Sequence, residues 1–186
     1  MGKLSRDLEP TPDADLVEAI GRGDVSAFDE LYARYRDWVF RLAYRFTGDE
    51  RNAEDVLHAA FAHLLEKSPR LPLYLRLTTF LYPAVKRLSL SMLRDRGRTT
   101  VVDAILERLF SAKTTPEQSA QAELASGVAL LPQEQRETLL MHSVDGMSLE
   151  EIGEALGIPE GTAESRLRKA IAALRGDPHA RAYFEE

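Results

Sequence analysis

Apolar residues recur at intervals of three and four positions along most of the chain, which is the spacing that places them on one face of an α-helix. One such series begins at Phe28 and ends with Phe46, just before Gly48. No segment shows a clear alternation of apolar and polar residues, the pattern of a half-buried β-strand. The pattern therefore predicts an all-α protein.

The first half of the chain has the pattern of a helical bundle. We predict helices over residues 11–20, 26–47, 52–67 and 70–96. Ser26 and Asp29 resemble a capping box at the start of the second helix. Pro83 lies inside the last helix and predicts a kink or a new helix start, because proline has no N–H to donate.

The helical pattern weakens between residues 97 and 119, where threonine, proline and glutamine are frequent, as in a linker. A second helical set follows this stretch. We therefore predict two small helical domains joined by a linker, with the first domain over residues 12–96, the linker over 97–119 and the second domain over 120–176.

Residues 147–175 have the pattern of a helix-turn-helix. Ser148 and Glu151 form a capping box, Gly157 suits a tight turn, and Pro159 suits the first turn of the next helix. In such a motif the second helix can enter the major groove of DNA. A plain helical hairpin with a solvated polar face would give the same periodicity, so the pattern alone leaves both interpretations open.

The second helix of this motif has a polar and basic side opposite its apolar side. At about 100° per residue, the outward side chains are Thr162, Ser165, Arg168 and Lys169. Hydroxyls and a guanidinium suit base edges, and cations suit phosphates. Arg166 lies on a flank, where a phosphate contact and an internal salt bridge are both open to it.

Composition narrows the class of protein. The chain has 186 residues, of which 44% are hydrophobic and 29% charged, and it contains no cysteine. Disulfides and thiolate metal sites are therefore excluded, and a reducing cytoplasm is the expected location. No apolar run approaches the roughly 20 residues of a membrane span, so we expect no membrane insertion.

The formal net charge of −6 is unevenly distributed. Residues 1–116 carry 18 Lys and Arg against 17 Asp and Glu, whereas residues 117–186 carry 6 against 13. The acidity thus belongs to the C-terminal part. Within the N-terminal part, residues 70–98 hold seven basic side chains and one acid, Asp95. This basic patch is compatible with a nucleic-acid partner despite the negative total.

An enzyme receives little support from the sequence. His58 and His63 are five residues apart, about 140° around a helix, and so would not readily share a metal. No nucleophile–base pair or glycine-rich phosphate loop stands out. We expect no catalytic residue, no metal site and no cofactor.

Several motifs resemble a known family. The segments 131–137, 148–153 and 161–167 look like region 4 of bacterial sigma factors. The segments 28–49 and 53–61 are similar to region 2 of the extracytoplasmic-function (ECF) group of the sigma-70 family. Together the resemblance covers about residues 12–175, in the order and spacing of the family, and two separate matches are more specific than one helix-turn-helix.

The resemblance implies a transcription initiation factor that binds core RNA polymerase and directs it to promoter DNA, with an anti-sigma factor or other regulator as an expected partner. Region 2 would bind the polymerase through Asp55, His58, Ala59, Ala62 and Glu66. It would open the proximal promoter element with Phe80, Lys86, Arg87, Arg94, Arg96 and Arg98. Region 4 would read the distal element with Thr162, Ser165, Arg166, Arg168 and Lys169.

The chain departs from the family pattern in region 2. His58 and Ala59 stand where the family usually has Gln-Glu, and Phe80 stands where it favours tryptophan. Arg87 and Ser91 replace an asparagine and an aspartate. An alternative function therefore stays open: a sigma-like adaptor that binds an anti-sigma factor or regulator without initiating transcription.

Overall fold

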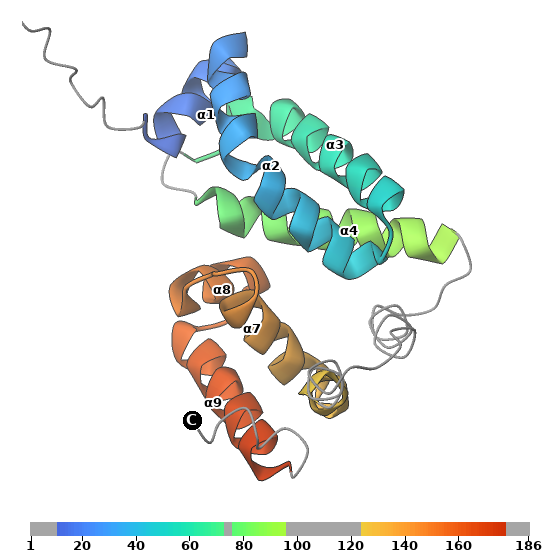
Figure 1. Cartoon of the computed structure of the whole chain (residues 1–186). Helices are drawn as coiled ribbons and strands as arrows, with labels where there is room; N and C mark the ends of the chain where they lie inside the picture. Colours follow the sequence, from blue (N-terminus) through green and yellow to red (C-terminus); the bar gives the residue numbers. More distant parts are fainter. Residues whose placement is uncertain (1–10, 73–75, 96–123, 178–186) are drawn as a thin grey trace, which may run out of the picture.

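The structure, a computed structural model, describes residues 11–72, 76–95 and 124–177. Its regular elements in these ranges are all helical, which confirms the predicted all-α class. The N-terminal elements are α1 (Asp13–Gly21), α2 (Val25–Thr47), α3 (Glu50–Lys67), the short 3₁₀ helix η1 (Ser68–Arg70) and α4 (Leu77–Asp95). Helices α2, α3 and α4 pack on one another, and α1 packs on α2 (Figure 1).

The start of α2 differs from the predicted capping box. The Asp24 side chain is the N-cap and accepts hydrogen bonds from the backbone N–H groups of Ser26 and Ala27, at 2.9 and 3.2 Å. The box of Ser26 and Asp29 is therefore wrong, because Asp24 caps the helix two residues earlier and leaves Ser26 inside it. At the other end Gly48 has a φ of 68°, a left-handed conformation that suits glycine.

Helix α4 is shorter than predicted and uninterrupted. Arg70, where the prediction began it, is the last residue of η1, and α4 itself begins at Leu77. Pro83 lies within the helix without a new start, which decides that prediction in favour of one helix. Leu81, Tyr82 and Val85 on the same helix are fully buried, and such side chains each stabilise a fold by about 1.5–3 kcal/mol.

The C-terminal elements are α7 (Gln133–Ser143), α8 (Leu149–Leu156) and α9 (Glu160–Gly176), preceded by helical residues 124–130. The capping box of Ser148 and Glu151 is confirmed: each side chain accepts from the other's backbone N–H, at 2.8 and 3.2 Å. Gly157, with a φ of 66°, makes the turn between α8 and α9. A small core of this part contains Leu131, Leu139, Leu167, Ala170 and Leu174.

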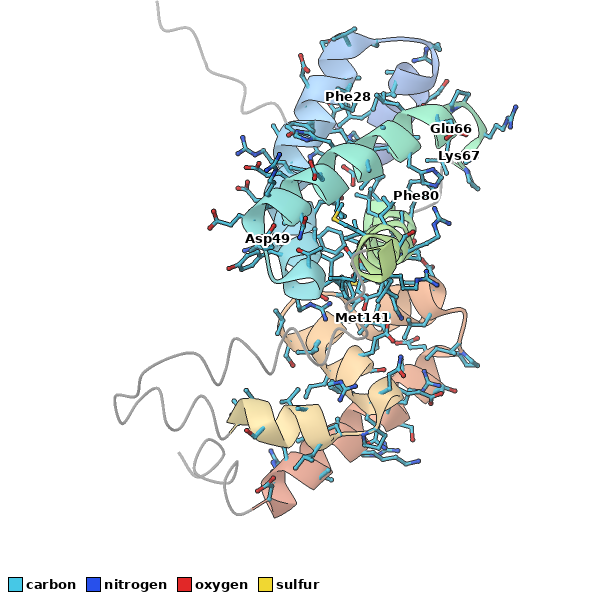
Figure 2. The ribbon with its side chains drawn as sticks, turned by 90° about the vertical axis from the view of Figure 1, so that its right-hand side faces the viewer. Phe28, Asp49, Glu66, Lys67, Phe80 and Met141 are labelled. Carbon is cyan, nitrogen blue, oxygen red and sulfur yellow. The ribbon has the colours of Figure 1, made fainter. Side chains whose placement is uncertain are left out.

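The two helical sets pack against each other, and the sequence did not predict this contact. Helix α8 lies against α4, and Figure 1 shows α7 and α8 beneath the bundle. Met141 and Met147 are at most 2% exposed and belong to the same buried cluster as Leu81 and Tyr82. Met141 lies at the junction of the two sets (Figure 2).

The predicted domain boundaries stay predictions, and the inner ones, at 96/97 and 119/120, fall among residues outside the described ranges. Within the described residues, no helix combines the length and the apolar character that crossing a membrane requires.

Candidate nucleic-acid interface

The side of helix α9 that we predict to read DNA faces solvent. Arg168 and Lys169 are exposed, and Thr162 and Ser165 are half-buried. The opposite side of the helix is anchored in the domain, with Ala163, Leu167, Ala170 and Leu174 buried. The apolar anchor fixes the rotation of the helix and leaves the polar face available for a major groove.

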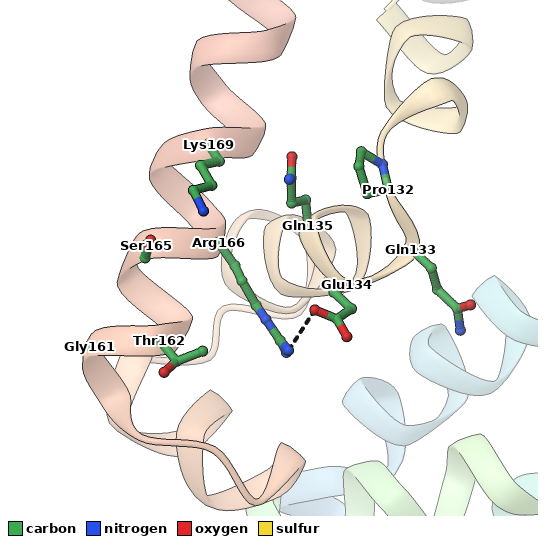
Figure 3. A pocket seen from close by; sticks show the side chains of 9 residues that line it. All are labelled: Pro132, Gln133, Glu134, Gln135, Gly161, Thr162, Ser165, Arg166 and Lys169. Carbon is green, nitrogen blue, oxygen red and sulfur yellow. Dashed lines mark ion pairs between the residues drawn. The ribbon is translucent and has the colours of Figure 1, made fainter.

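A hollow of about 410 Å³ lies between this face and the start of α7. Thr162, Ser165 and Lys169 line it from α9, and Gln133 and Gln135 line it from α7 (Figure 3). Hydroxyls, amides and one ammonium group converge there. Such donors suit phosphate and base-edge oxygens.

Arg166 reaches across the same hollow to α7. Its guanidinium lies 2.7 Å from the Glu134 carboxylate, and its side chain is only 21% exposed (Figure 3). The structure thus contains the internal salt bridge that was one of the two sequence-based interpretations. Glu134 is 70% exposed, so a phosphate could displace it from Arg166 without unfolding the domain.

Arg168, in contrast, has an exposed pair on its own helix. Its guanidinium lies 3.5 Å from the Glu164 carboxylate one turn earlier, and both side chains are at least 60% exposed. Such a pair contributes roughly 0.3–0.5 kcal/mol. The guanidinium is therefore easily freed for a base edge.

The predicted proximal-element residues lie in different environments. Phe80 stacks on His63 of α3, with ring centroids 5.6 Å apart and planes 8° from parallel. A guanidinium nitrogen of Arg87 lies 3.4 Å from the same imidazole. His63 therefore covers part of Phe80, and Figure 2 shows Phe80 on the side of α4 that faces α3.

Among the cations predicted to contact the proximal element, some are exposed to solvent and one pairs with the other domain. Arg94 is exposed at the end of α4. Lys86 forms an ion pair with Glu137 of α7, so it is engaged across the domain contact. Arg96 and Arg98 lie outside the described residues.

The predicted polymerase-binding side of α3 faces outward. Asp55, His58, Ala62 and Glu66 are exposed, and Ala59 is half-buried. Sequence reasoning missed Leu65, which is 44% exposed beside them. Its position three residues after Ala62 was the available signal, because residues i and i+3 share a helix face.

The contact between the two helical sets is centred on a buried ion pair. The Asp145 carboxylate lies 2.5 Å from the Arg45 guanidinium, with 5% and 12% of the two side chains exposed. The Trp38 indole N–H donates to the backbone oxygen of Asp145 at 2.8 Å. Burial raises the pKa of the Asp145 carboxyl to about 6, although Arg45 opposes this change.

Three further side-chain contacts surround this pair. The Arg76 guanidinium lies 2.6 Å from Glu150, and the Thr78 hydroxyl donates to Glu151 at 2.6 Å. The Tyr82 hydroxyl donates to Glu137 at 3.1 Å, beside the pair of Glu137 with Lys86. Carboxylates of the C-terminal helices thus meet cations and hydroxyls of α4 and the guanidinium of Arg76 just before it. In the described ranges, no group of three or more acidic or histidine side chains is placed to hold a metal ion.

Both halves of the chain match protein families. Residues 31–99 match the family described as Sigma-70 region 2, and residues 121–174 match Sigma-70, region 4. The two matches flank residues 100–120.

Several curated proteins are similar over most of their length. The chain is 32% identical to the ECF RNA polymerase sigma factor SigM of Mycobacterium tuberculosis strain H37Rv, over 87% of this chain and 82% of that protein. It is 31% identical to the ECF RNA polymerase sigma factor SigE of Mycolicibacterium smegmatis, over 90% of this chain and 67% of that protein. SigW of Bacillus subtilis, also an ECF RNA polymerase sigma factor, is 26% identical, over 86% and 92%.

Solved structures share the fold. CnrH in complex with the cytosolic domain of CnrY is similar with a TM-score of 0.65 and 23% identity, over 89% of this chain and 96% of that one. The sigma factor RpoE in complex with the anti-sigma factor NepR, from Bartonella quintana, is similar with a TM-score of 0.57 and 18% identity, over 82% and 96%.

Proposed function

The chain belongs to the ECF group of RNA polymerase sigma factors, and we propose a division of its work among three surfaces. The outer side of α3 binds core RNA polymerase, the basic side of α4 contacts the melted proximal promoter element, and α9 reads the distal element as duplex DNA. The observation that carries this proposal is the exposed polar face of α9, held by a buried apolar side in a helix-turn-helix.

The polymerase surface rests on the exposed side of α3. Ala62 and Leu65 offer apolar contact area, and Asp55 and Glu66 flank them with negative charge. Small and apolar side chains allow another helix to approach closely, while the acids suit a basic partner. None of these side chains is buried in the fold, so they are available to a partner.

The proximal-element surface rests on Phe80, Arg87 and Arg94. Cations that follow a backbone, together with an aromatic ring for stacking, are the usual means of binding single-stranded DNA. Because Phe80 already stacks on His63, a base would use its remaining face or displace the imidazole. This surface therefore supports contact with melted DNA through cations first and the ring second.

A regulator is a further part of the proposal. The structural neighbour RpoE is bound by an anti-sigma factor, and we propose a partner of that kind for this chain. The adaptor hypothesis remains as a second candidate, because Lys86 of the proximal set is paired with Glu137 and is not free for DNA.

Core binding and transcription in vitro test the proposal together. We expect the parent protein to bind core polymerase and to initiate from specific promoters, which sequencing of RNA 5′ ends would identify. Asp55→Arg and Ala62→Arg should weaken binding to core. Asp37→Arg is the control, since Asp37 is an 83% exposed acid on α2. Core binding without initiation would favour the adaptor, and unchanged binding by both α3 variants would place the polymerase surface elsewhere.

A further inference from the structure

Two carboxylates of the C-terminal domain occupy two cations of the basic patch on the N-terminal domain. Glu150 at the start of α8 pairs with Arg76, at 2.6 Å. Glu137 of α7 pairs with Lys86 and also accepts the Tyr82 hydroxyl. Arg76 and Lys86 both belong to the basic stretch of residues 70–98.

The pair of Glu137 and Lys86 belongs to a packed contact, with side chains only 16% and 29% exposed. Arg76 and Glu150 are more open, at 45% and 55%. The same contact between the domains contains the buried pair of Asp145 with Arg45. Arg45 belongs to α2 and Asp145 follows α7, so this buried pair joins the two domains.

An apolar layer supports the polar contacts. Met141 of α7, Met147 before α8 and Ile152 of α8 are at most 2% exposed, in one cluster with buried residues of α2 and α4. An interface that removes this much apolar side chain from water is favourable by itself. The ion pairs then fix the orientation of the two domains.

We propose that the free protein is self-inhibited: the C-terminal domain closes on α4, and Glu137 and Glu150 take the place of DNA phosphates on Lys86 and Arg76. An ammonium or guanidinium paired with a carboxylate must exchange it for a phosphate, so closure and DNA contact compete for the same cations. The closure depends only on the contacts described. Its competition with DNA also depends on the proposed role of α4.

The uneven distribution of charge along the chain agrees with the proposed self-inhibition. The C-terminal part has seven more acids than bases, an excess that is unfavourable for a domain whose task is to approach DNA. Two of these acids face the basic patch in the closed state. The other two surfaces stay open, because the reader side of α9 and the outer side of α3 remain exposed.

Two double variants with the same change in charge test the closure. Glu137→Ala with Glu150→Ala removes the two pairs across the contact. Glu134→Ala with Glu164→Ala is the control, since these acids pair with arginines inside the C-terminal domain. Small-angle X-ray scattering of the full chain should give a larger radius of gyration for the first variant and the parental value for the control. Parental scattering from the first variant would overturn the closure by these carboxylates.

A charge exchange distinguishes the loss of the ion pair of Lys86 and Glu137 from misfolding. Glu137→Lys places two cations together and should expand the molecule, whereas Lys86→Glu combined with Glu137→Lys restores the pair and should return the scattering towards that of the parent. Circular dichroism of each variant reports whether the helices are intact. Expansion that the exchange does not reverse would contradict a role for this pair.

Fluorescence anisotropy with labelled oligothymidine tests the competition. The interface variant should bind about fivefold more tightly at low salt than Asp29→Ala with Glu54→Ala, since two additional cations become available. This second control removes two exposed acids of the N-terminal bundle and frees no cation of the domain contact or of α9. Equal affinities in an expanded variant would overturn the competition with DNA while leaving closure intact. The proposed function fails separately, if the parent with core polymerase initiates no transcription.

Discussion

The guanidinium of Arg166 lies 2.7 Å from the carboxylate of Glu134, so the recognition helix is tied to α7 through a side chain that lines the DNA-reading hollow. Two residues further along, Arg168 is 69% exposed against 21% for Arg166. Before they contact DNA, Arg166 must therefore break an ion pair with another helix, whereas Arg168 must break only an exposed pair within its own helix.

Arg168→Ala should relax the base preference at one position of the distal element. A bidentate arginine contact to guanine is worth about 1–3 kcal/mol of discrimination, whereas a phosphate contact weakens all sequences alike. Arg166→Ala should therefore lower affinity nearly uniformly and reduce the dependence on salt. A binding selection over randomised duplexes, run with both variants at two salt concentrations, measures this difference.

Glu134→Gln provides the control for Arg166, because it removes the partner and keeps the guanidinium. Parental or tighter DNA binding by this variant supports a phosphate contact by Arg166. If both changes lower thermal stability and neither changes DNA binding, Arg166 only braces the two helices. A changed motif with Arg166→Ala and an unchanged one with Arg168→Ala would reverse the assignment.

Gly153→Ala should destabilise the C-terminal domain. A Cβ atom at this position would lie 2.9 Å from the backbone oxygen of Ile158, which is closer than real contacts allow. Overpacking of this kind costs about 1–3 kcal/mol. Gly161→Ala is the matched control, since nothing lies within 4 Å of its added Cβ and alanine favours a helix by roughly 1 kcal/mol. Thermal unfolding followed by circular dichroism should separate the two, and equal midpoints would refute the close approach.

A cross-link between the two domains should prevent promoter opening. The sequence contains no cysteine, so Thr78→Cys with Glu151→Cys introduces one defined pair where the side chains lie 2.6 Å apart. When a short, reducible thiol reagent joins them, we expect retained binding to core and loss of open complexes, which permanganate reactivity of promoter DNA measures. Reduction should restore opening, and Thr78→Cys alone with the same reagent is the control. Full opening by the linked protein would contradict the need to separate the domains.

Acidic pH should favour the closed state. Burial raises the pKa of the Asp145 carboxyl from 3.8 to about 6, so the closed form binds its proton more tightly than the open form does. This group's contribution to closure is therefore complete below about 4 and is lost as the pH rises through about 6. The radius of gyration should decrease between pH 7 and pH 5.

Asp145→Asn should remove most of this pH dependence, because its neutral amide resembles the protonated carboxyl. The charged neighbours of Asp145 are Arg45 and Arg41, whose positive charges oppose the rise of its pKa. The pKa of Glu151 is lowered, since hydrogen bonds from Thr78 and Ser148 outweigh its burial, so its effect begins only at more acidic pH. An unchanged pH profile in Asp145→Asn would exclude Asp145 as the responsible group.

Local patterns predicted much of the fold. The capping box of Ser148 and Glu151 was predictable because all of its partners lie within one helical turn. The box at Ser26 failed for an equally local reason: Asp24 caps the helix two residues earlier, and the sequence does not say which of two nearby caps prevails.

Local sequence patterns could not predict the contact between the two domains. Arg45 and Asp145 are 100 residues apart, and Lys86 and Glu137 are 51 apart. Glu137 has the spacing of an ordinary solvated helix position, and Asp145 lies between two helices beside a glycine, so nothing in either neighbourhood identifies a partner. The one available signal was global, namely the separation of a basic stretch from an acidic C-terminal part.

The position of α3 determines the order in which polymerase binding and domain opening can occur. Helices α7 and α8 lie beneath the bundle, and the outer side of α3 is still exposed (Figure 1). A closed molecule can therefore meet the polymerase first and separate its domains afterwards. Assembly would then have two successive steps. The rate of the encounter increases with polymerase concentration, whereas the rate of domain opening reaches a fixed limit. Promoters would compete only for molecules whose domains have already opened.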